Sequence, residues 1–288
     1  LYTPMFDNGE LDISALEALA ERVASAGLGL VACGTTGETP TLTSEEYDTV
    51  VKVAVRVAAG RVPVTVGTGT NNTQSAIRLT QHAAALGADA ALVVVPYYNK
   101  PPQAALIDHF TDIADASSIP LMLYNVPGRT GTNMNAETTL ALAHHPQIIA
   151  VKEASADLDQ IQRLLSEAPE GFAVLSGDDA WTTPVMLLGG HGVVSVAGNV
   201  VPKALSALVS ACVAGDLTEA RRLQRTLLPL FDGLFVTSNP IPVKFVAACL
   251  EQANTRVRQP LSASSLDEAS QHVVRAALAL AWPEEASR

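Results

Sequence analysis

The chain has 288 residues, of which 48% are hydrophobic and 16% charged, so it is able to bury a large core and is not a disordered protein. Its formal net charge of -11 and the absence of a basic stripe argue against a nucleic-acid partner, which needs clustered Lys and Arg. No apolar run reaches the ~18 residues of a membrane span, so no membrane is expected as a partner, and three widely spaced cysteines suit reduced thiols in a cytoplasm.

Short β-branched runs alternate along the chain with longer Ala- and Leu-rich stretches of helical period, a pattern typical of βαβ units and a parallel sheet. Glycines in SAGLGLV, ALGADAALVVV and LLGGHGVVSV stand where the preceding helix needs a C-cap. The apolar runs predict eight strands, at residues 1–5, 29–34, 62–69, 91–96, 120–127, 148–154, 172–179 and 192–199. Eight such units predict an α/β fold, a (β/α)8 TIM barrel over residues 1–215.

The strand signal stops near Asp216, and helical stretches follow. Asp216 and Glu219 have the spacing of a capping box at the start of a helix. We therefore expect a small C-terminal helical domain over residues 216–288. The first predicted strand begins abruptly at Leu1, and from this we expect a natural N-terminus several residues longer.

Residues that can carry chemistry follow the predicted strands at the end where barrel enzymes have their active sites. Lys152 is the only one of the five lysines that ends an apolar strand on this side. A packed barrel interior disfavours a charged amine, which makes the free amine accessible as a nucleophile. The alternative is a structural lysine that pairs with a carboxylate such as Glu153 or Asp178, and the spacing alone leaves both readings open.

Tyr124 ends the strand before that of Lys152, so the phenol and the amine are expected to converge over the barrel mouth. A phenol can relay protons between a substrate carbonyl and solvent, although a tyrosine anchored at a barrel rim is the simpler explanation. The segment GTTGE, residues 34–38, adds two hydroxyls and a Gly-rich turn whose N–H groups can hold a small carboxylate, and a plain tight turn is its alternative. Together these groups predict Schiff-base chemistry on a small 2-oxo acid.

The segments GTTGETPTL, PYYNKP, YNVPGRTG, VKEAS, LSGDD, GGHGVVSV and NPIPVKF stand in this order along nearly the whole chain. Their sequence and spacing resemble the 4-hydroxy-tetrahydrodipicolinate (dihydrodipicolinate) synthases, a family of the pyruvate-dependent class I aldolase superfamily. The resemblance implies a TIM barrel with a C-terminal helical domain, and a cytoplasmic lyase that condenses pyruvate with L-aspartate 4-semialdehyde in lysine and diaminopimelate biosynthesis. It also implies no metal, no organic cofactor and a homotetramer built from tight dimers.

The resemblance also assigns roles to eight residues. Lys152 would form the Schiff base with pyruvate, and Tyr124 would donate and accept protons. Thr35 would link Tyr124 to Tyr98, which the neighbouring subunit supplies across the tight-dimer interface. The substrate-binding positions would be Thr36 for the pyruvate carboxylate, Arg129 for the semialdehyde carboxylate, Val194 through its main-chain carbonyl and Gly177, which leaves room beside the lysine.

The family resemblance further suggests how the chain responds to lysine, which inhibits regulated relatives at the tight-dimer interface. This chain has Ser75 where the regulated pattern has a glutamate, and Ser44 and Tyr47 where it has histidines. We therefore expect weak inhibition or none. The full set of corresponding positions is Thr39, Pro40, Ser44, Tyr47, Asn71, Ser75 and Tyr97.

Several other functions fit the sequence less well. The segment GTGTNN lacks the third glycine of a dinucleotide-binding fingerprint, and no Gly-x-Ser-x-Gly elbow supplies a hydrolase nucleophile. A barrel that only binds small molecules is disfavoured by the complete set of reactive residues. The alternative that remains is a related aldolase, N-acetylneuraminate lyase or a 2-keto-3-deoxy sugar acid aldolase, since these share the lysine and the tyrosine.

Overall fold

The computed structural model describes residues 1–286, which form two compact units. One unit comprises Leu1–Val64 and the chain from Ser195 onward, and the other is Thr65–Val194. Within residues 1–286 no helix is long and apolar enough to cross a membrane. The sequence predicts a different division, into a barrel domain at residues 1–215 and a helical domain at residues 216–288. The compact units do not test that division, so it stays a prediction.

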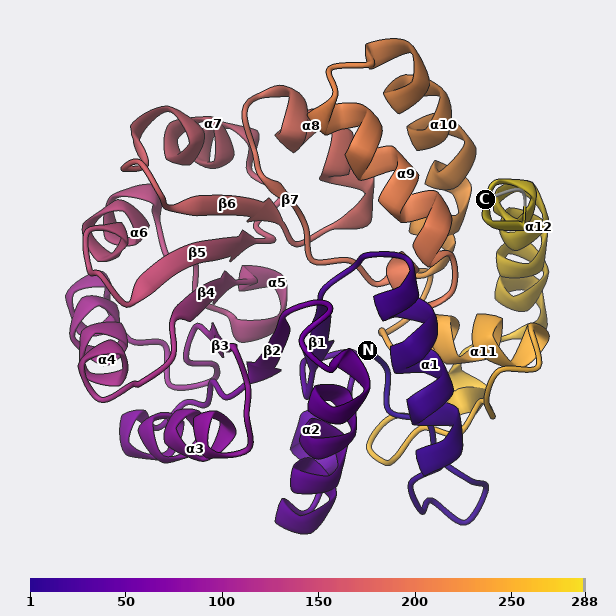
Figure 1. Cartoon of the computed structure of the whole chain (residues 1–288), viewed down its shortest axis with the longest axis horizontal. Helices are drawn as coiled ribbons and strands as arrows, with labels where there is room; N and C mark the ends of the chain where they lie inside the picture. The colour runs from indigo at the N-terminus through magenta and orange to yellow at the C-terminus, as the bar shows by residue number, and fades with distance from the viewer. Residues whose placement is uncertain (287–288) are drawn as a thin grey trace. The chain divides into compact units, whose positions relative to one another are not determined.

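A parallel sheet organises the unit Thr65–Val194 (Figure 1). Each strand pairs with the next one in chain order, and helices α3, α4, α6 and α7 lie on the outer side of these strands. The strands are β2 Val64–Gly67, β3 Ala90–Val94, β4 Leu121–Asn125, β5 Ile148–Glu153, β6 Ala173–Ser176 and β7 Gly192–Val193. The helices are α3 Thr73–Ala85, α4 Gln103–Asp115, α5 Pro127–Thr130, α6 Ala136–Ala143, α7 Leu158–Glu167, η2 Asp179–Trp181 and α8 Thr182–Leu187. This unit is therefore an α/β structure with a parallel sheet, as the alternating pattern predicts.

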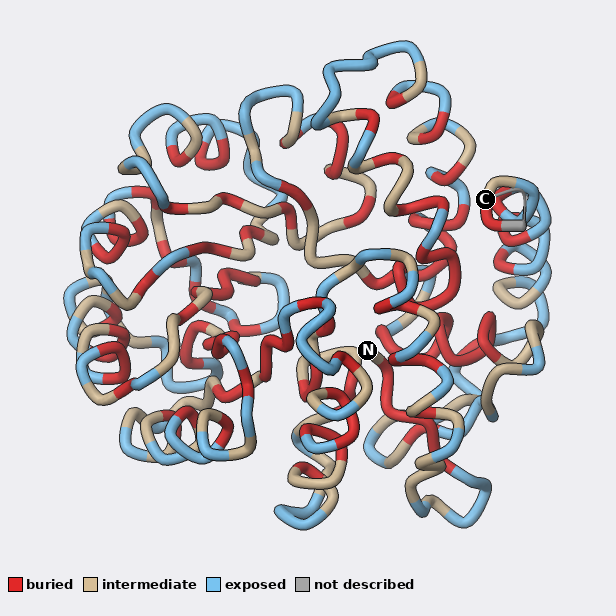
Figure 2. Tube along the Cα trace, viewed as in Figure 1, coloured by how far each residue is buried: buried red, intermediate tan, exposed pale blue. Residues whose placement is uncertain are grey.

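The core of this unit lies between its strands and the inner faces of its helices. Val93, Leu123 and Val151 of the strands are fully buried together with Phe110 of α4 and Leu164 of α7. Figure 2 shows the same pattern along the chain, with buried strands and helices that are buried on one side only. Burial on both faces explains why these strands read as continuous apolar runs rather than as alternating ones.

The other unit is mainly helical. Asp12, Thr43 and Asp216 cap three of its helices by accepting hydrogen bonds from backbone N–H groups of the first turn. Its elements are α1 Ile13–Ser25, β1 Leu30–Ala32, η1 Thr39–Thr41, α2 Ser44–Ala58, η3 Ala197–Asn199, α9 Pro202–Val213, α10 Leu217–Gly233, α11 Ile241–Cys249, η4 Ala263–Ser265 and α12 Glu268–Ala286. The helix predicted to start at Asp216 is confirmed, because the Asp216 side chain accepts a 3.0 Å bond from the N–H of Glu219.

The three glycines predicted to end helices all adopt left-handed backbone conformations. Gly27, Gly87 and Gly189 have φ angles of 76°, 94° and 103°. Each follows the C-cap residue of its helix, α1, α3 or α8. A residue with a side chain is strained in this conformation, so the glycine pattern in the sequence correctly marks these turns.

The prediction of a strand at residues 1–5 is wrong, and the described residues contain seven strands rather than eight. Met5 makes only an isolated antiparallel bridge with Leu11. Tyr2 donates its N–H to a side chain, the Oδ1 of Asn199, and Pro4 has no N–H, so the segment does not form a continuous ladder. The strand predicted at residues 192–199 is also shorter, since only Gly192–Val193 is extended and Ala197–Asn199 forms a 3₁₀ turn.

Candidate active site

Lys152 and Tyr124 lie side by side at the ends of β5 and β4. The two residues are direct partners in the register of these strands. The Nζ of Lys152 is 4.2 Å from the centroid of the Tyr124 ring, and the tyrosine is only 6% exposed. Parallel strands end at the same edge of a sheet, so the amine and the aromatic ring share one face at that edge.

The surroundings of Lys152 show whether it pairs with a carboxylate. Lys152 is half-buried, and within residues 1–286 it forms no salt bridge. The carboxylate of Glu153 instead accepts bonds from amide groups, and Asp178 caps a 3₁₀ turn by accepting from the N–H of Ala180. The alternative that pairs Lys152 with Glu153 or Asp178 is therefore wrong.

Gly177 lies next to the side chain of Lys152. A Cβ atom at position 177 would lie 3.2 Å from the Cε of Lys152 and 2.6 Å from the Cβ of Ala154. The N–H of Gly177 donates a 2.7 Å bond to the carbonyl of Glu153. Any other residue at position 177 would therefore press on the lysine or shift the strand end.

Arg129 and Tyr98 lie on the segments that follow β4 and β3. Arg129 belongs to α5, a four-residue helix, and is exposed. Tyr98 donates its N–H to the carbonyl of Thr130 at 3.4 Å, which joins the two segments. Tyr98 is 88% exposed and has a left-handed φ of 74°, an unusual conformation for a bulky residue.

Val194 follows β7 and donates its N–H to the carbonyl of Ser176 at 2.8 Å. This bond places it beside Gly177 at the end of β6. Six of the eight predicted site residues thus lie in the unit Thr65–Val194, and Lys152 lies next to both Tyr124 and Gly177 there. The other two, Thr35 and Thr36, belong to the unit that contains α1 and α2.

Thr35 and Thr36 lie in the GTTGE turn. The N–H groups of Gly37 and Glu38 are used within the turn, where they bond to the carbonyls of Gly34 and Thr35 at 3.0 and 3.1 Å. The Oγ1 of Thr36 accepts a 2.8 Å bond from the Nδ2 of Asn239. Since a hydroxyl can donate one proton while it accepts, the Thr36 hydroxyl can still donate its own proton to an acceptor.

A buried ion pair fixes the end of the same turn. Glu38 has a φ of 55°, and its Oε1 is 2.5 Å from the Nζ of Lys244 on α11. The Nζ of Lys244 also donates to the carbonyl of Arg256 at 2.6 Å, and the N–H of Arg258 donates to the other oxygen of Glu38 at 2.8 Å. Burial lowers the pKa of Lys244, and the charge of Glu38 opposes this effect. Lys244 is therefore a structural lysine.

Sequence reasoning did not single out Asn239, Glu38 or Lys244 as partners of the GTTGE turn. Asn239 and Lys244 lie 203 and 206 residues from Thr36 and Glu38, so no local spacing connects them. The only signal was the segment NPIPVKF, which contains both residues and contributed to the family resemblance.

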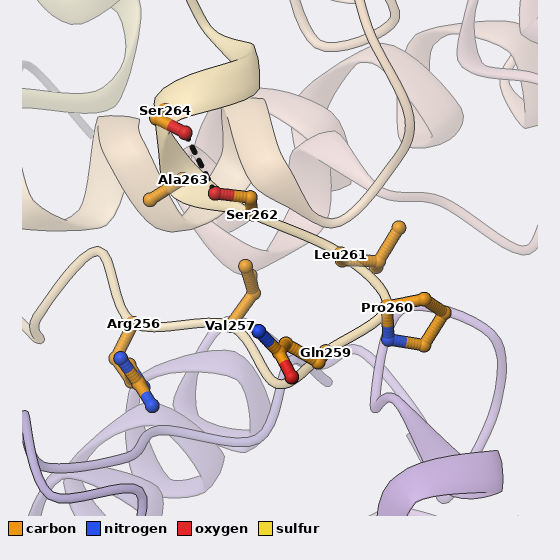
Figure 3. A pocket seen from close by; sticks show the side chains of 8 residues that line it. All are labelled: Arg256, Val257, Gln259, Pro260, Leu261, Ser262, Ala263 and Ser264. Carbon is orange, nitrogen blue, oxygen red and sulfur yellow. Dashed lines mark hydrogen bonds between the residues drawn. The ribbon is translucent and has the colours of Figure 1, made fainter.

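An open surface pocket lies along a single loop (Figure 3). It is lined by Arg256, Val257, Gln259, Pro260, Leu261, Ser262, Ala263 and Ser264. The hydroxyl oxygens of Ser262 and Ser264 are 2.7 Å apart and share a hydrogen bond. No cluster of titratable groups converges on this pocket among its eight lining residues, so we do not regard it as a reaction site.

Comparisons with known proteins agree with one another. Residues 1–280 match the model of the dihydrodipicolinate synthetase family. The chain is 50% identical to the 4-hydroxy-tetrahydrodipicolinate synthase of Exiguobacterium sibiricum over 90% of this chain and 88% of the relative, and 48% identical to that of Methanoculleus marisnigri over 96% of each. It also resembles the crystal structure of the chloride-inhibited dihydrodipicolinate synthase from Acinetobacter baumannii complexed with pyruvate, with a TM-score of 0.94, 42% identity and coverage of 98% and 97% of the two chains.

Proposed function

Because this chain belongs to the dihydrodipicolinate synthetase family, we propose that it condenses pyruvate with L-aspartate 4-semialdehyde to form 4-hydroxy-tetrahydrodipicolinate. It is an enzyme, a lyase of the class I aldolase type. The observation that carries the proposal is the amine of Lys152 beside the ring of Tyr124, with no carboxylate bound to it within residues 1–286. The names of the relatives favour this reaction over cleavage of a sugar acid.

The first half of the reaction makes a carbon nucleophile from pyruvate. The neutral amine of Lys152 attacks the C2 carbonyl of pyruvate, and loss of water gives an imine. Removal of a proton from C3 then gives an enamine. Tyr124 carries protons to and from the reacting atoms, and Thr35 and Tyr98 continue the relay.

The second half forms the new carbon–carbon bond and releases the lysine. The enamine attacks the aldehyde carbon of the semialdehyde, whose oxygen takes up a proton. The amino group of the semialdehyde then attacks C2 and displaces Lys152 as the ring closes. The imine on Lys152 takes up the electron pair left at C3 when the proton is removed, so the proposed reaction needs neither a metal nor an organic cofactor.

Substrate carboxylates account for the remaining residues. The hydroxyl of Thr36, with the N–H groups of Thr35 and Thr36, holds the carboxylate of pyruvate, because the N–H groups of Gly37 and Glu38 are already used in the turn. The carbonyl of Val194 faces pyruvate, and Gly177 leaves space for it. Arg129 binds the carboxylate of the semialdehyde with two parallel hydrogen bonds.

The assembly that we propose is a cytoplasmic homotetramer of (β/α)8 barrels with C-terminal helical domains, built from tight dimers. The parallel strands in chain order and the likeness to solved synthases support the barrel. The exposed Tyr98, held in a left-handed conformation by the chain around it, supports a dimer in which this ring crosses to the partner. Sedimentation velocity of wild type and Tyr98→Ala tests the dimer, because the variant is expected to dissociate more readily.

Borohydride trapping tests the proposed chemistry directly. Reduction in the presence of pyruvate is expected to fix a three-carbon adduct on Lys152, which peptide mass spectrometry locates. Omission of pyruvate is the control and should give no adduct. An adduct on Lys203 or Lys244, or no adduct at all, would contradict the proposal.

A further inference from the structure

The carboxylate of Glu153 lies directly after Lys152 in the chain but faces the other side of the sheet. Glu153 is paired with Asn125 in the same way that Lys152 is paired with Tyr124. Side chains alternate along a strand, so one pair faces the proposed site and the next pair faces the outer helices. Glu153 is only 2% exposed and Asn125 is fully buried.

Neutral N–H groups surround the Glu153 carboxylate. The Nδ2 of Asn125 lies 3.1 Å from both carboxylate oxygens, the Nε2 of Gln160 is 3.0 Å from Oε2, and the N–H of Ser155 is 2.7 Å from Oε1. Burial raises the pKa of Glu153, and these bonds oppose the increase because they favour the ionised form. A buried carboxylate held by neutral donors is destabilised when any one of these donors is lost.

The same bonds continue into the loop that follows Arg129. The Oδ1 of Asn133 accepts from the Nδ2 of Asn125 at 2.8 Å, and the Nδ2 of Asn133 donates to the Oε1 of Gln160 at 2.9 Å. The Oδ1 of Asn125 accepts from the N–H of Met134 at 3.0 Å. The side chains of Asn125, Glu153, Gln160 and Asn133 thus form a closed network, here called the amide clamp, between β4, β5, α7 and the loop after α5.

The amide clamp sits where the backbone ladder ends. The carbonyl of Asn125 accepts from the N–H of Ala154 at 2.9 Å, and the carbonyl of Glu153 accepts from the N–H of Gly177 at 2.7 Å. These are backbone bonds one residue beyond Tyr124 and Lys152. Side-chain bonds at this level therefore resist any separation of the strand ends that hold the amine, the phenol and Gly177.

From this arrangement we infer that Glu153 is a positioning residue, which through the amide clamp fixes the distance between Lys152 and Tyr124. The inference rests on the proposed function, since it concerns the formation of the pyruvate imine on Lys152. Glu153 does not touch the substrate, because its carboxylate faces the opposite side of the sheet. A displacement of reacting groups by about 1 Å can cost about a hundredfold in rate, which is the effect that loss of the clamp is expected to approach.

The first variant is Glu153→Gln. Its side chain keeps the shape of glutamate, but an NH2 group replaces one carboxylate oxygen and then faces the N–H donors that this oxygen accepted from. The rate of imine formation with pyruvate, measured by rapid quenching into borohydride, is expected to fall about 10- to 100-fold. The fall should appear in kcat more than in KM for pyruvate, since the carboxylate-binding turn is unchanged. Should this variant not fold, Gln160→Met removes one donor to Glu153 and one acceptor for Asn133, and it is expected to slow imine formation several-fold.

A second substitution that restores the hydrogen bonds distinguishes a positioning role of Glu153 from a general loss of stability. In the double variant Glu153→Gln/Gln160→Glu, the new carboxamide at position 153 donates to the new carboxylate at position 160, and Ser155 and Asn133 keep acceptors. The 3.2 Å bond from the Nε2 of Gln160 to the carbonyl of Met134 is not restored. Imine formation is expected to return to within about threefold of wild type. The control is Glu285→Gln, because Glu285 is also a buried carboxylate, 6% exposed, that accepts from the N–H groups of Lys203 and Ala204 far along the chain.

Each result bears on a different statement. Slow imine formation in Glu153→Gln, with rescue in the double variant and normal rates in Glu285→Gln, supports the inference. Normal imine formation in folded Glu153→Gln, no rescue in a folded double variant, or an equal loss in Glu285→Gln would overturn it while leaving the proposed function intact. If wild type traps no pyruvate on Lys152, the proposed function fails and the inference fails with it.

Discussion

Lys152 and Lys244 are both withdrawn from solvent, but their ammonium groups have opposite surroundings. Lys244 is fully buried, and its Nζ is held by the carboxylate of Glu38 at 2.5 Å and the carbonyl of Arg256 at 2.6 Å. Lys152 is half-buried, and its Nζ lies 4.2 Å from the centre of the Tyr124 ring. The contacts of Lys244 stabilise its charge and occupy its donors, whereas those of Lys152 leave the nitrogen available to an electrophile.

The difference teaches that burial alone does not identify a reactive lysine. Burial lowers the pKa of Lys244, yet its Nζ is bound to Glu38 and the side chain is fully buried, so a substrate cannot reach it. A reactive amine needs a site in which no carboxylate stabilises its charged form. The absence of an ion pair at Lys152 within residues 1–286 is therefore as informative as its position at a strand end.

The largest expected effect comes from exchanging each lysine for methionine. Lys152→Met removes the nucleophile and is expected to lower kcat at least about a thousandfold with little change in the free energy of unfolding. Lys244→Met leaves Glu38 buried without its partner and is expected to cost about 3–5 kcal/mol of folding free energy. Denaturant unfolding and steady-state kinetics on both variants measure the two quantities.

The double variant Glu38→Met/Lys244→Met is the control for the second half of this prediction. Replacing both members of a buried pair with apolar residues removes the unpaired charge, so much of the lost stability should return. If Lys244→Met is as stable as wild type, or if Lys152→Met keeps its activity, the contrast between the two lysines is wrong.

A second prediction extends the contrast to His109, a buried basic group that stays neutral. His109 is 6% exposed, its Nδ1 lies 2.9 Å from the Oγ1 of Thr73, and burial lowers its pKa to about 4. An unfolded histidine titrates near 6.5, so between pH 6.5 and 4 the unfolded chain binds more protons and stability falls as pH falls. This group is expected to remove about 2–3 kcal/mol between pH 7 and pH 4.5.

The variant His109→Asn keeps a polar atom near Thr73 but cannot take up a proton. Urea unfolding at pH 7 and pH 4.5 should show a smaller acid loss in this variant than in wild type, by about 2–3 kcal/mol. Equal acid losses in the two proteins would mean that His109 takes up a proton in the folded state as readily as in the unfolded one.

The third prediction concerns Arg129, an exposed cation proposed to bind a ligand rather than to stabilise the fold. Arg129→Ala is expected to lower kcat/KM for the semialdehyde at least about tenfold, because a hydrogen bond to a charged group contributes roughly 1.5–3 kcal/mol. Trapping of pyruvate on Lys152 should persist. Arg163→Ala is the control, since Arg163 is also an exposed arginine and its ion pairs with Glu137 and Glu167 lie at the helices α6 and α7. Normal condensation in Arg129→Ala would assign the semialdehyde carboxylate to another residue.

Local patterns in the sequence predicted the placement of Lys152 and Tyr124 well. A strand that ends in a polar residue fixes which edge of a parallel sheet receives the side chain, so two neighbouring strand ends suffice to bring an amine and a phenol together. Glycines that need a left-handed backbone are equally visible, as Gly27 and Gly87 show. These features depend on a few adjacent residues, and that is why they can be read without a structure.

The partners of buried polar groups could not be predicted in the same way. Glu153 finds Asn125 and Gln160 through the register of two strands and the placement of a helix, and Glu38 finds Lys244 across 206 residues. The failed strand at residues 1–5 has a similar cause, because the N–H of Tyr2 bonds to the distant Asn199. Contacts between residues far apart in the chain decide these cases, and no local periodicity encodes them.

The last prediction applies the lesson of Lys244 to free lysine as a ligand. An ammonium group that leaves water needs a carboxylate such as Glu38, and a lost charge partner in a partly buried site costs about 2–5 kcal/mol, or tenfold to thousands-fold in affinity. This chain has Ser75 where lysine-regulated relatives are expected to have a glutamate, and its Oγ accepts a bond from Arg78. Tyr47, at a position expected to be histidine in those relatives, is only 6% exposed. Millimolar lysine is therefore expected to leave the initial rate nearly unchanged.

Ser75→Glu tests whether the missing carboxylate at position 75 is the reason for the expected lack of inhibition by lysine. If the missing carboxylate is what weakens lysine binding, the variant should be inhibited at lower lysine concentration than wild type, because the new charge supplies the partner that an ammonium requires. Ser75→Gln has nearly the same shape without the charge and should behave like wild type. Inhibition of wild type at micromolar lysine would show that another group binds the ammonium, and equal responses of the two variants would show that the charge at position 75 is not what decides.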